Sequence, residues 1–168
     1  MIFYVIAAVT ALLDQASKWI VVHHVEHGPV LGELVRLTLT YNSGAAFGMF
    51  SGARAPFIVI SVVAAVGLIY AHHVLPAVDR TRRIPMALIL GGNLGNLVDR
   101  LRVGRVTDFI DMGFGDARWP TYNIADIAVV LGAVALALTL IVEMLQEKRT
   151  TPREASETVA AGNSADAR

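Results

Sequence analysis

Four long apolar segments dominate this sequence, and each has about the length that a helix needs to cross a bilayer. They cover residues 2–22, 56–75, 84–101 and 123–145. About 20 apolar residues in a helix span the hydrocarbon core of a membrane. Lipid also favours helices because they satisfy their own backbone hydrogen bonds. The sequence therefore predicts an all-α membrane protein with four transmembrane helices, a domain of residues 1–146.

Composition agrees with this class and excludes several others. The 168 residues are 55% hydrophobic and only 17% charged, above the apolar content of an average soluble domain. A formal net charge of zero gives no indication of nucleic-acid binding. There are no cysteines, which excludes disulfides and a cysteine nucleophile, and no H-E-x-x-H motif is present. We expect no metal or cofactor. The polar residues 147–168 lack apolar content and are expected to be a disordered tail.

The polar residues of the apolar segments fall in positions that converge on one face of the bilayer. Consecutive spans alternate in direction, so the ends of the first and third lie beside the starts of the second and fourth. The convergent residues are Asp14, Lys18, Asn93, Asn96, Asp99, Arg100, Asn123 and Asp126, with Asp108 in the loop joining the third and fourth spans. Ionisable residues in lipid are costly and usually functional. We interpret this convergence as a site.

The basic residues give an orientation. Residues 80–83 contain three arginines, and more basic residues follow the fourth span, on the side away from the site. The positive-inside rule makes that side cytoplasmic, with both termini inside and the site outside. Arg102, Arg105 and Arg118 lie on the site side and weaken the signal, unless they serve the site.

The outer segment of residues 23–55 has structure of its own. Apolar and polar residues alternate from Val35 to Tyr41, which predicts a strand with one apolar face. The small apolar residues 44–50 are suited to a short interfacial helix. Phe114, Trp119 and Tyr122 are expected to anchor the same level in the interface. The result would be a small extracytoplasmic β-sheet cradle over the site.

Asp108 and Asp126 are the strongest catalytic candidates. Two carboxylates at a dry boundary can share one proton and activate a water molecule. Asn123 is a plausible N-cap of the fourth span, which places Asp126 in its first turn, where the helix dipole favours charge. We therefore predict that Asp126 carries the charge and Asp108 the proton. The pair would titrate together.

The other polar residues leave alternatives open. Asp14 and Lys18 are spaced i, i+4 and could form a structural ion pair, with Lys18 extending outward, or support the site. Asn93, Asn96 and Arg100 form one stripe, which fits either hydrogen bonds between helices or binding of peptide carbonyls. Asp99 lies off this stripe and could pair with a neighbouring helix or with Arg100. The three glycines at 91, 92 and 95 allow close approach by a helix or a ligand.

Five separated motifs resemble the lipoprotein signal peptidase family, signal peptidase II, in the order of that family. They are Asp14-Gln15-x-x-Lys18, Asn42-x-Gly44-x-Ala46-Phe47, Gly95-Asn96-x-x-Asp99-Arg100, Val106-x-Asp108-Phe109 and Asn123-x-Ala125-Asp126. The match covers about residues 10–130. Thr107 departs from the apolar residue expected before the aspartate, and its hydroxyl could hydrogen-bond Asp108.

The resemblance implies an aspartic endopeptidase of the bacterial plasma (inner) membrane. It would remove signal peptides from diacylglyceryl-modified prolipoproteins by cutting before the lipidated cysteine, and would need no cofactor or obligate protein partner. It implies a catalytic pair of Asp108 and Asp126. The residues implied to bind or support at the site are Asn42, Asn96, Arg100, Asn123, Asp14 and Lys18.

A proton- or cation-coupled transporter is the main alternative, because such proteins also carry intramembrane charges. Against it, the polar residues gather at one face, and the second span contributes none. No polar route across the bilayer is evident from the sequence.

Overall fold

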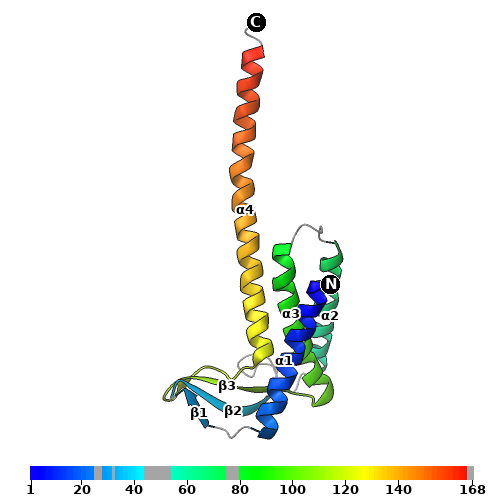
Figure 1. The fold of residues 1–168 in the computed structure, drawn as a ribbon, viewed down its shortest axis with the longest axis vertical. Helices are drawn as coiled ribbons and strands as arrows, with labels where there is room; N and C mark the ends of the chain where they lie inside the picture. Colours follow the sequence, from blue (N-terminus) through cyan, green and yellow to red (C-terminus); the bar gives the residue numbers. More distant parts are fainter. Residues whose placement is uncertain (25–27, 32, 44–53, 75–79, 166–168) are drawn as a thin grey trace.

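In the part of the chain that the structure describes, four helices lie side by side, and a small sheet covers one end of them (Figure 1). The computed structural model describes residues 1–24, 28–31, 33–43, 54–74 and 80–165, with the backbone alone for 28–31, 80 and 147–165. The helices are α1 (Ile2–His24), α2 (Arg54–Val74), α3 (Arg80–Arg102) and α4 (Ile124–Ala165). The strands are β1 (Gly28–Leu31), β2 (Val35–Asn42), β3 (Val106–Phe114) and β4 (Ala117–Arg118).

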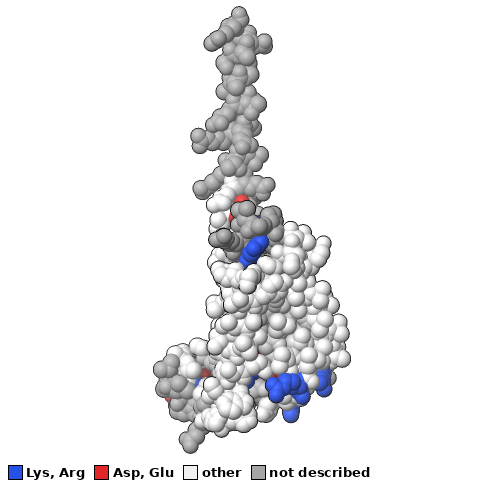
Figure 2. All heavy atoms as spheres, turned by 45° about the vertical axis from the view of Figure 1, so that its right-hand side comes forward, with Lys and Arg blue, Asp and Glu red and all other residues white. Residues whose placement is uncertain are grey.

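Three of the helices are long and apolar enough to cross a membrane. They are α1, α2 and the part of α4 from Ile124 to Gln146. Many of their large apolar side chains face outward, such as Leu12 at 68% and Val63 at 66% exposure. On the face shown in Figure 2, the middle of the bundle has almost no charged atoms. An apolar outer surface of this kind fits lipid rather than water, so the chain is a membrane protein.

The third predicted span, residues 84–101, is present as helix α3, but its composition does not mark it as a membrane span. Its second half carries Asn93, Asn96, Asp99 and Arg100, which lower its apolar content. This helix packs against all three others, α1, α2 and α4. Because its neighbours shield it, α3 can carry polar residues that a lipid-facing helix could not. Four transmembrane helices therefore remain a prediction.

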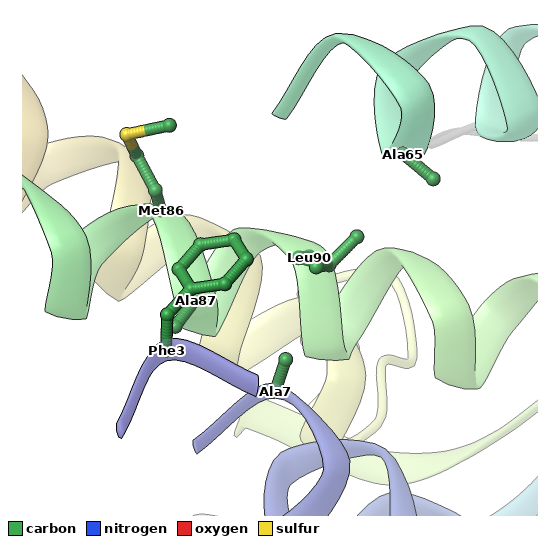
Figure 3. Close-up of a cluster of buried hydrophobic side chains, with 6 residues drawn as sticks. All are labelled: Phe3, Ala7, Ala65, Met86, Ala87 and Leu90. Atoms are coloured by element: carbon green, nitrogen blue, oxygen red, sulfur yellow. The ribbon is translucent and has the colours of Figure 1, made fainter. Parts of the chain in front are cut away.

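The apolar core lies between α1, α2 and α3 at the end of the bundle opposite the sheet. Figure 3 shows Phe3 and Ala7 of α1 against α3, with Ala65 of α2 nearby. Met86, Ala87 and Leu90 are the α3 members of this cluster. Phe3 is 1% exposed and its ring stacks on His72 of α2 at 4.0 Å. The histidine at this end therefore packs against aromatic residues, as expected of an interfacial side chain.

Glycines let α3 approach its neighbours closely. A Cβ atom at Gly92 would lie 2.4 Å from the backbone oxygen of Ala125 in α4. At Gly91 it would lie 2.6 Å from the backbone oxygen of Ala7 in α1. Small residues at such crossings are typical of membrane helix packing. Of the two interpretations of these glycines, contact between helices is therefore the one observed.

The sheet is antiparallel throughout, in the order β1-β2-β3-β4. The predicted strand from Val35 to Tyr41 is confirmed as β2. Its partner β3 lies where the sequence predicted only a loop between the third and fourth spans, so that expectation was wrong. Asp108 is in β3, opposite Thr40 of β2. The predicted interfacial helix lies outside the described residues, since 44–53 are not among them.

Helix α4 extends well beyond the rest of the bundle (Figure 1). Its backbone is helical to Ala165, through most of the segment for which the sequence predicted a disordered tail. None of the other described helices and strands lies beside this extension in Figure 1. The division into a domain of residues 1–146 and a tail of 147–168 stays a prediction.

Candidate active site

Asp108 is held in β3 by two amide side chains. Asn123 Nδ2 donates to its Oδ1 at 2.6 Å, and Asn42 Nδ2 donates to its Oδ2 at 3.2 Å. Among the described residues these are its hydrogen-bond donors, and the Thr107 hydroxyl expected from the sequence is not one of them. The residue is only 2% exposed. Burial, followed by the nearby Asp126 carboxylate, raises the pKa of Asp108 to about 6.

Asp126 lies in the first turn of α4, as the sequence predicted. Its backbone N–H donates to Oδ1 of Asn123 at 2.9 Å, and its Oδ2 accepts from the Asn123 backbone N–H at 3.2 Å. This is the reciprocal arrangement of a capping box, with asparagine as N-cap. The other carboxylate oxygen, Oδ1, accepts from Asn96 Nδ2 of α3 at 2.8 Å. The cap therefore fixes the orientation of this carboxylate.

Asn123 connects the two carboxylates. It is fully buried, its amide donates to Asp108, and its backbone donates to Asp126. Both aspartates line one cavity of about 1020 Å³. Their mutual electrostatic effect is large enough to contribute to the raised pKa of Asp108. The raised pKa favours a proton on Asp108. The predicted division of proton and charge between the two carboxylates stays a prediction.

Beneath this pair lies a buried ionic cluster joining α1 to α3. Lys18 Nζ lies 2.7 Å from Asp14 Oδ2 and 3.0 Å from Asp99 Oδ2. It also donates to Asn96 Oδ1 at 3.1 Å. The Lys18 side chain is 5% exposed, so it points inward and does not extend to solvent. Because Asn96 in turn donates to Asp126, hydrogen bonds connect this cluster to the Asp126 carboxylate.

Asp14 also contacts α4 directly. Its Oδ1 accepts the backbone N–H of Ala125 at 2.9 Å. A carboxylate at a helix N-terminus satisfies an otherwise unpaired N–H and complements the helix dipole. Asp14 therefore fixes the start of α4, where Asp126 lies.

Asp99 links the end of α3 to the strand that carries Asp108. Its backbone oxygen accepts from Val103 at 2.8 Å and from Gly104 at 3.2 Å, and Gly104 has φ +83°. This left-handed residue ends the helix, as glycine commonly does. The Asp99 carboxylate then accepts the Thr107 N–H at 2.9 Å. The turn therefore places Asp108 directly after a fixed backbone position.

Arg100 lines the cavity at the end of α3, on the same side as the two aspartates. Its guanidinium lies 5.2 Å from the centre of the Phe57 ring, a cation–π contact with α2. It is only half-buried and can donate to a ligand in the cavity. The cavity otherwise has mainly apolar walls, from the β3–β4 hairpin and from α4 residues such as Val130 and Leu131.

The structure brings together Asp108, Asp126 and the residues expected to bind or support at the site, which are Asn42, Asn96, Arg100, Asn123, Asp14 and Lys18. Asn93 is the exception within the stripe, because its amide donates to the Ser61 backbone oxygen of α2 at 2.8 Å. Gln15 was not predicted as a supporting residue. Asp99 was expected to pair with a neighbouring helix or with Arg100, and it pairs with Lys18 of the neighbouring helix α1. Gln15 Nε2 donates to Asp99 Oδ1 at 2.9 Å. Both residues occur in the quoted motifs, which was the signal available.

Known proteins match this chain over most of its length. The family described as "Signal peptidase (SPase) II" matches residues 6–142. This chain belongs to the signal peptidase II family. The tail from residue 147 lies outside the matched region, whereas every residue of the site lies within it.

Individual proteins similar to this chain lead to the same family. Lipoprotein signal peptidase of Halalkalibacterium halodurans is 38% identical over 157 residues, covering 92% of this chain and 98% of that protein. The protein of the same name from Syntrophus aciditrophicus is 39% identical over 156 residues, covering 88% and 94%. A solved bacterial membrane enzyme is similar in fold, with a TM-score of 0.78, 27% identity and coverage of 84% of this chain and 88% of that one.

Proposed function

We propose that Asp108 and Asp126 are the catalytic pair of this aspartic peptidase, which removes signal peptides from prolipoproteins. The observation that carries the proposal is the link through Asn123. Two carboxylates from separate elements, β3 and α4, share this one buried residue and line one cavity. Membership of the signal peptidase II family supports the same reaction.

The two carboxylates have complementary roles in peptide hydrolysis. Asp126, ionised, takes a proton from a water molecule whose oxygen attacks the scissile carbonyl carbon. Asp108, protonated, gives its proton to the carbonyl oxygen as the tetrahedral intermediate forms. On collapse, the proton on Asp126 passes to the leaving nitrogen, the C–N bond breaks, and Asp108 recovers its proton from the intermediate. The pair is then ready for another turnover.

The surrounding residues suit an extended peptide. Arg100 faces the cavity beside the aspartates and would hold a substrate carbonyl, while Asn42 and Asn96 fix the two carboxylates. The substrate we propose is a prolipoprotein with a diacylglyceryl group on its cysteine, cut just before that residue. The apolar α4 wall of the cavity would let the acyl chains remain in lipid. Each buried CH₂ contributes about 0.8 kcal/mol to the membrane binding of the substrate.

We also propose a placement in the bacterial inner membrane, with α3 crossing it together with α1, α2 and α4. Both termini would be cytoplasmic and the sheet extracytoplasmic, because Arg82 and its neighbours lie at the opposite end of the bundle. The transporter alternative has no support, since the relatives are peptidases and the buried ionic cluster lies towards one end.

The test uses purified full-length protein with a diacylated and a non-acylated precursor peptide. Asp108→Asn and Asp126→Asn should each abolish cleavage of the diacylated peptide while the protein stays folded, with a melting temperature that does not collapse. Asp116→Asn is the matched control, because Asp116 is exposed in the β3–β4 turn, and it should cleave normally. Normal turnover by either site variant would disprove the pair. Equal cleavage of both peptides by the wild type would disprove the substrate class.

A further inference from the structure

Three exposed arginines gather at the site end of the bundle. Figure 2 shows Lys and Arg atoms clustered at this end. Arg54 begins α2, Arg102 ends α3, and Arg105 follows in the turn before β3, and all three are exposed. We call these three residues the outer arginine patch.

Contacts bring the patch together. Arg54 Nε donates to the Arg100 backbone oxygen at 2.9 Å, and its Nη2 donates to that of Leu101 at 2.9 Å. A Cβ at Gly104 would lie 3.4 Å from Arg54 Nη1, so Arg54 reaches across the turn between the other two arginines. Arg105 lies 5.0 Å from the centre of the Tyr41 ring. The patch is therefore built on the end of α3 and the edge of β2.

Other arginines of the chain are paired differently. Arg36 forms an ion pair with Glu33, and Arg118 pairs with Asp111 at 2.6 Å. Among the described residues, no carboxylate forms an ion pair with a member of the outer arginine patch. Its positive charge is consequently available to an external anion.

Apolar side chains alternate with the patch and indicate which anion fits. Leu101 and Val103 flank Arg102 and are 54% and 55% exposed. Exposed apolar residues interleaved with arginine, at the end of a membrane helix, are typical of a surface lying at lipid headgroup level. A soluble anion would need no such apolar neighbours.

We propose that the outer arginine patch binds the phosphate of anionic phospholipids, such as phosphatidylglycerol, beside the cavity. Guanidinium groups bind phosphate in bidentate geometry, and a basic residue near an anionic bilayer surface gains about 1 kcal/mol in general. This function also accounts for arginines on the face where the positive-inside rule disfavours them. The proposal rests on the extracytoplasmic bilayer placement given above and concerns lipid, not cleavage chemistry.

The test counts lipids retained by the purified full-length protein in mixed phosphatidylglycerol and phosphatidylcholine micelles, using native mass spectrometry. Arg102→Gln with Arg105→Gln should lower the preference for phosphatidylglycerol, by about fivefold for each arginine. Arg102→Lys with Arg105→Lys should keep most of it. Arg36→Gln is the matched control, because it also removes a positive charge, but from an arginine of the sheet that is already paired with Glu33. Inorganic phosphate should not compete.

Each alternative has its own result. An unchanged lipid preference in the double glutamine variant, at a wild-type melting temperature, would overturn the proposal. If that variant unfolds, Arg102→Gln alone decides, since Arg102 has no ring contact to lose among the described residues. An equal loss in Arg36→Gln would point to general charge, and competition by phosphate would point to a soluble anion. If the double glutamine variant has a raised KM for the precursor peptide in purely neutral bilayers, the patch binds the substrate peptide instead.

Discussion

The side-chain amide of Asn123 donates a 2.6 Å hydrogen bond to the carboxylate of Asp108. The same side chain accepts the backbone N–H of Asp126 as the N-cap of α4. One residue therefore has two separable roles, a donor to one aspartate and a helix cap for the other. Substitutions of different length can separate them.

Asn123→Ser should keep the cap and lose the contact with Asp108, because a serine hydroxyl can accept the Asp126 N–H but is too short to reach β3. We expect a melting temperature near that of the wild type and a kcat lowered about two- to tenfold, since a hydrogen bond to a neutral carboxyl contributes about 0.5–1.5 kcal/mol. Asn123→Ala should lose both, with an added stability cost of about 1 kcal/mol. Wild-type turnover in the serine variant would leave Asn123 only as a cap.

The raised pKa of Asp108 predicts how stability depends on pH. The ordinary value is 3.8 and the folded value about 6, so the folded state holds this proton more tightly than the unfolded state. The resulting stability is complete below pH 3.8 and is lost as pH rises through about 6, a loss of about 3 kcal/mol. An asparagine at this position has no proton that titrates. The melting temperature of Asp108→Asn minus that of the wild type should therefore increase from about pH 4 to about pH 7, the window around the two pKa values. A difference that does not change with pH would contradict the raised pKa of Asp108.

The helices were predictable from the sequence because lipid imposes a length and an apolar composition that few other structures require. The N-cap at Asn123 was equally local, since its partner Asp126 is three residues away. Strand β3 was not predicted. Its first four residues, from Val106 to Phe109, are all buried, so the alternation that identifies a half-exposed strand is absent.

Long-range pairings were the other part that the sequence could not supply. The contact of Gln15 with Asp99 joins residues 84 positions apart. It depends on how α1 and α3 are rotated about their axes, which the apolar pattern of a membrane helix constrains only weakly. The inward direction of Lys18 was missed for the same reason, because its second partner lies on another helix.

Lys18→Met should destabilise the protein strongly. Lys18 is the cation between two buried carboxylates, Asp14 and Asp99, and its removal leaves both uncompensated. Breaking a buried ion pair in this way costs about 3–5 kcal/mol. Thermal unfolding in detergent measures the loss, and adding Asp99→Asn to the variant should restore part of it. A melting temperature equal to that of the wild type would show that the cluster does not stabilise the bundle.

Gly95→Ala should also destabilise the bundle, because the new Cβ would lie 2.5 Å from Asp14 Oδ2. Moving that carboxylate disturbs its bonds to Lys18 and to the start of α4, and overpacking of this kind typically costs about 1–3 kcal/mol. Gly67→Ala in α2 is the control, since no described atom lies within 4 Å of the position that its Cβ would take, and its melting temperature should not fall. Equal melting temperatures of the two variants would contradict the close packing at Gly95.

Arg100→Ala should impair substrate binding more than folding. The side chain is half-buried in the cavity wall, and its contact with the Phe57 ring contributes about 0.5–1 kcal/mol, so the melting temperature should fall only slightly. A lost charged hydrogen bond to a substrate carbonyl should raise KM about tenfold or more. Arg100→Lys keeps the charge but not the planar guanidinium, so its KM should lie between those of the wild type and Arg100→Ala. If the melting temperature collapses while KM is unchanged, Arg100 is a structural residue of α3 and not a ligand for the peptide.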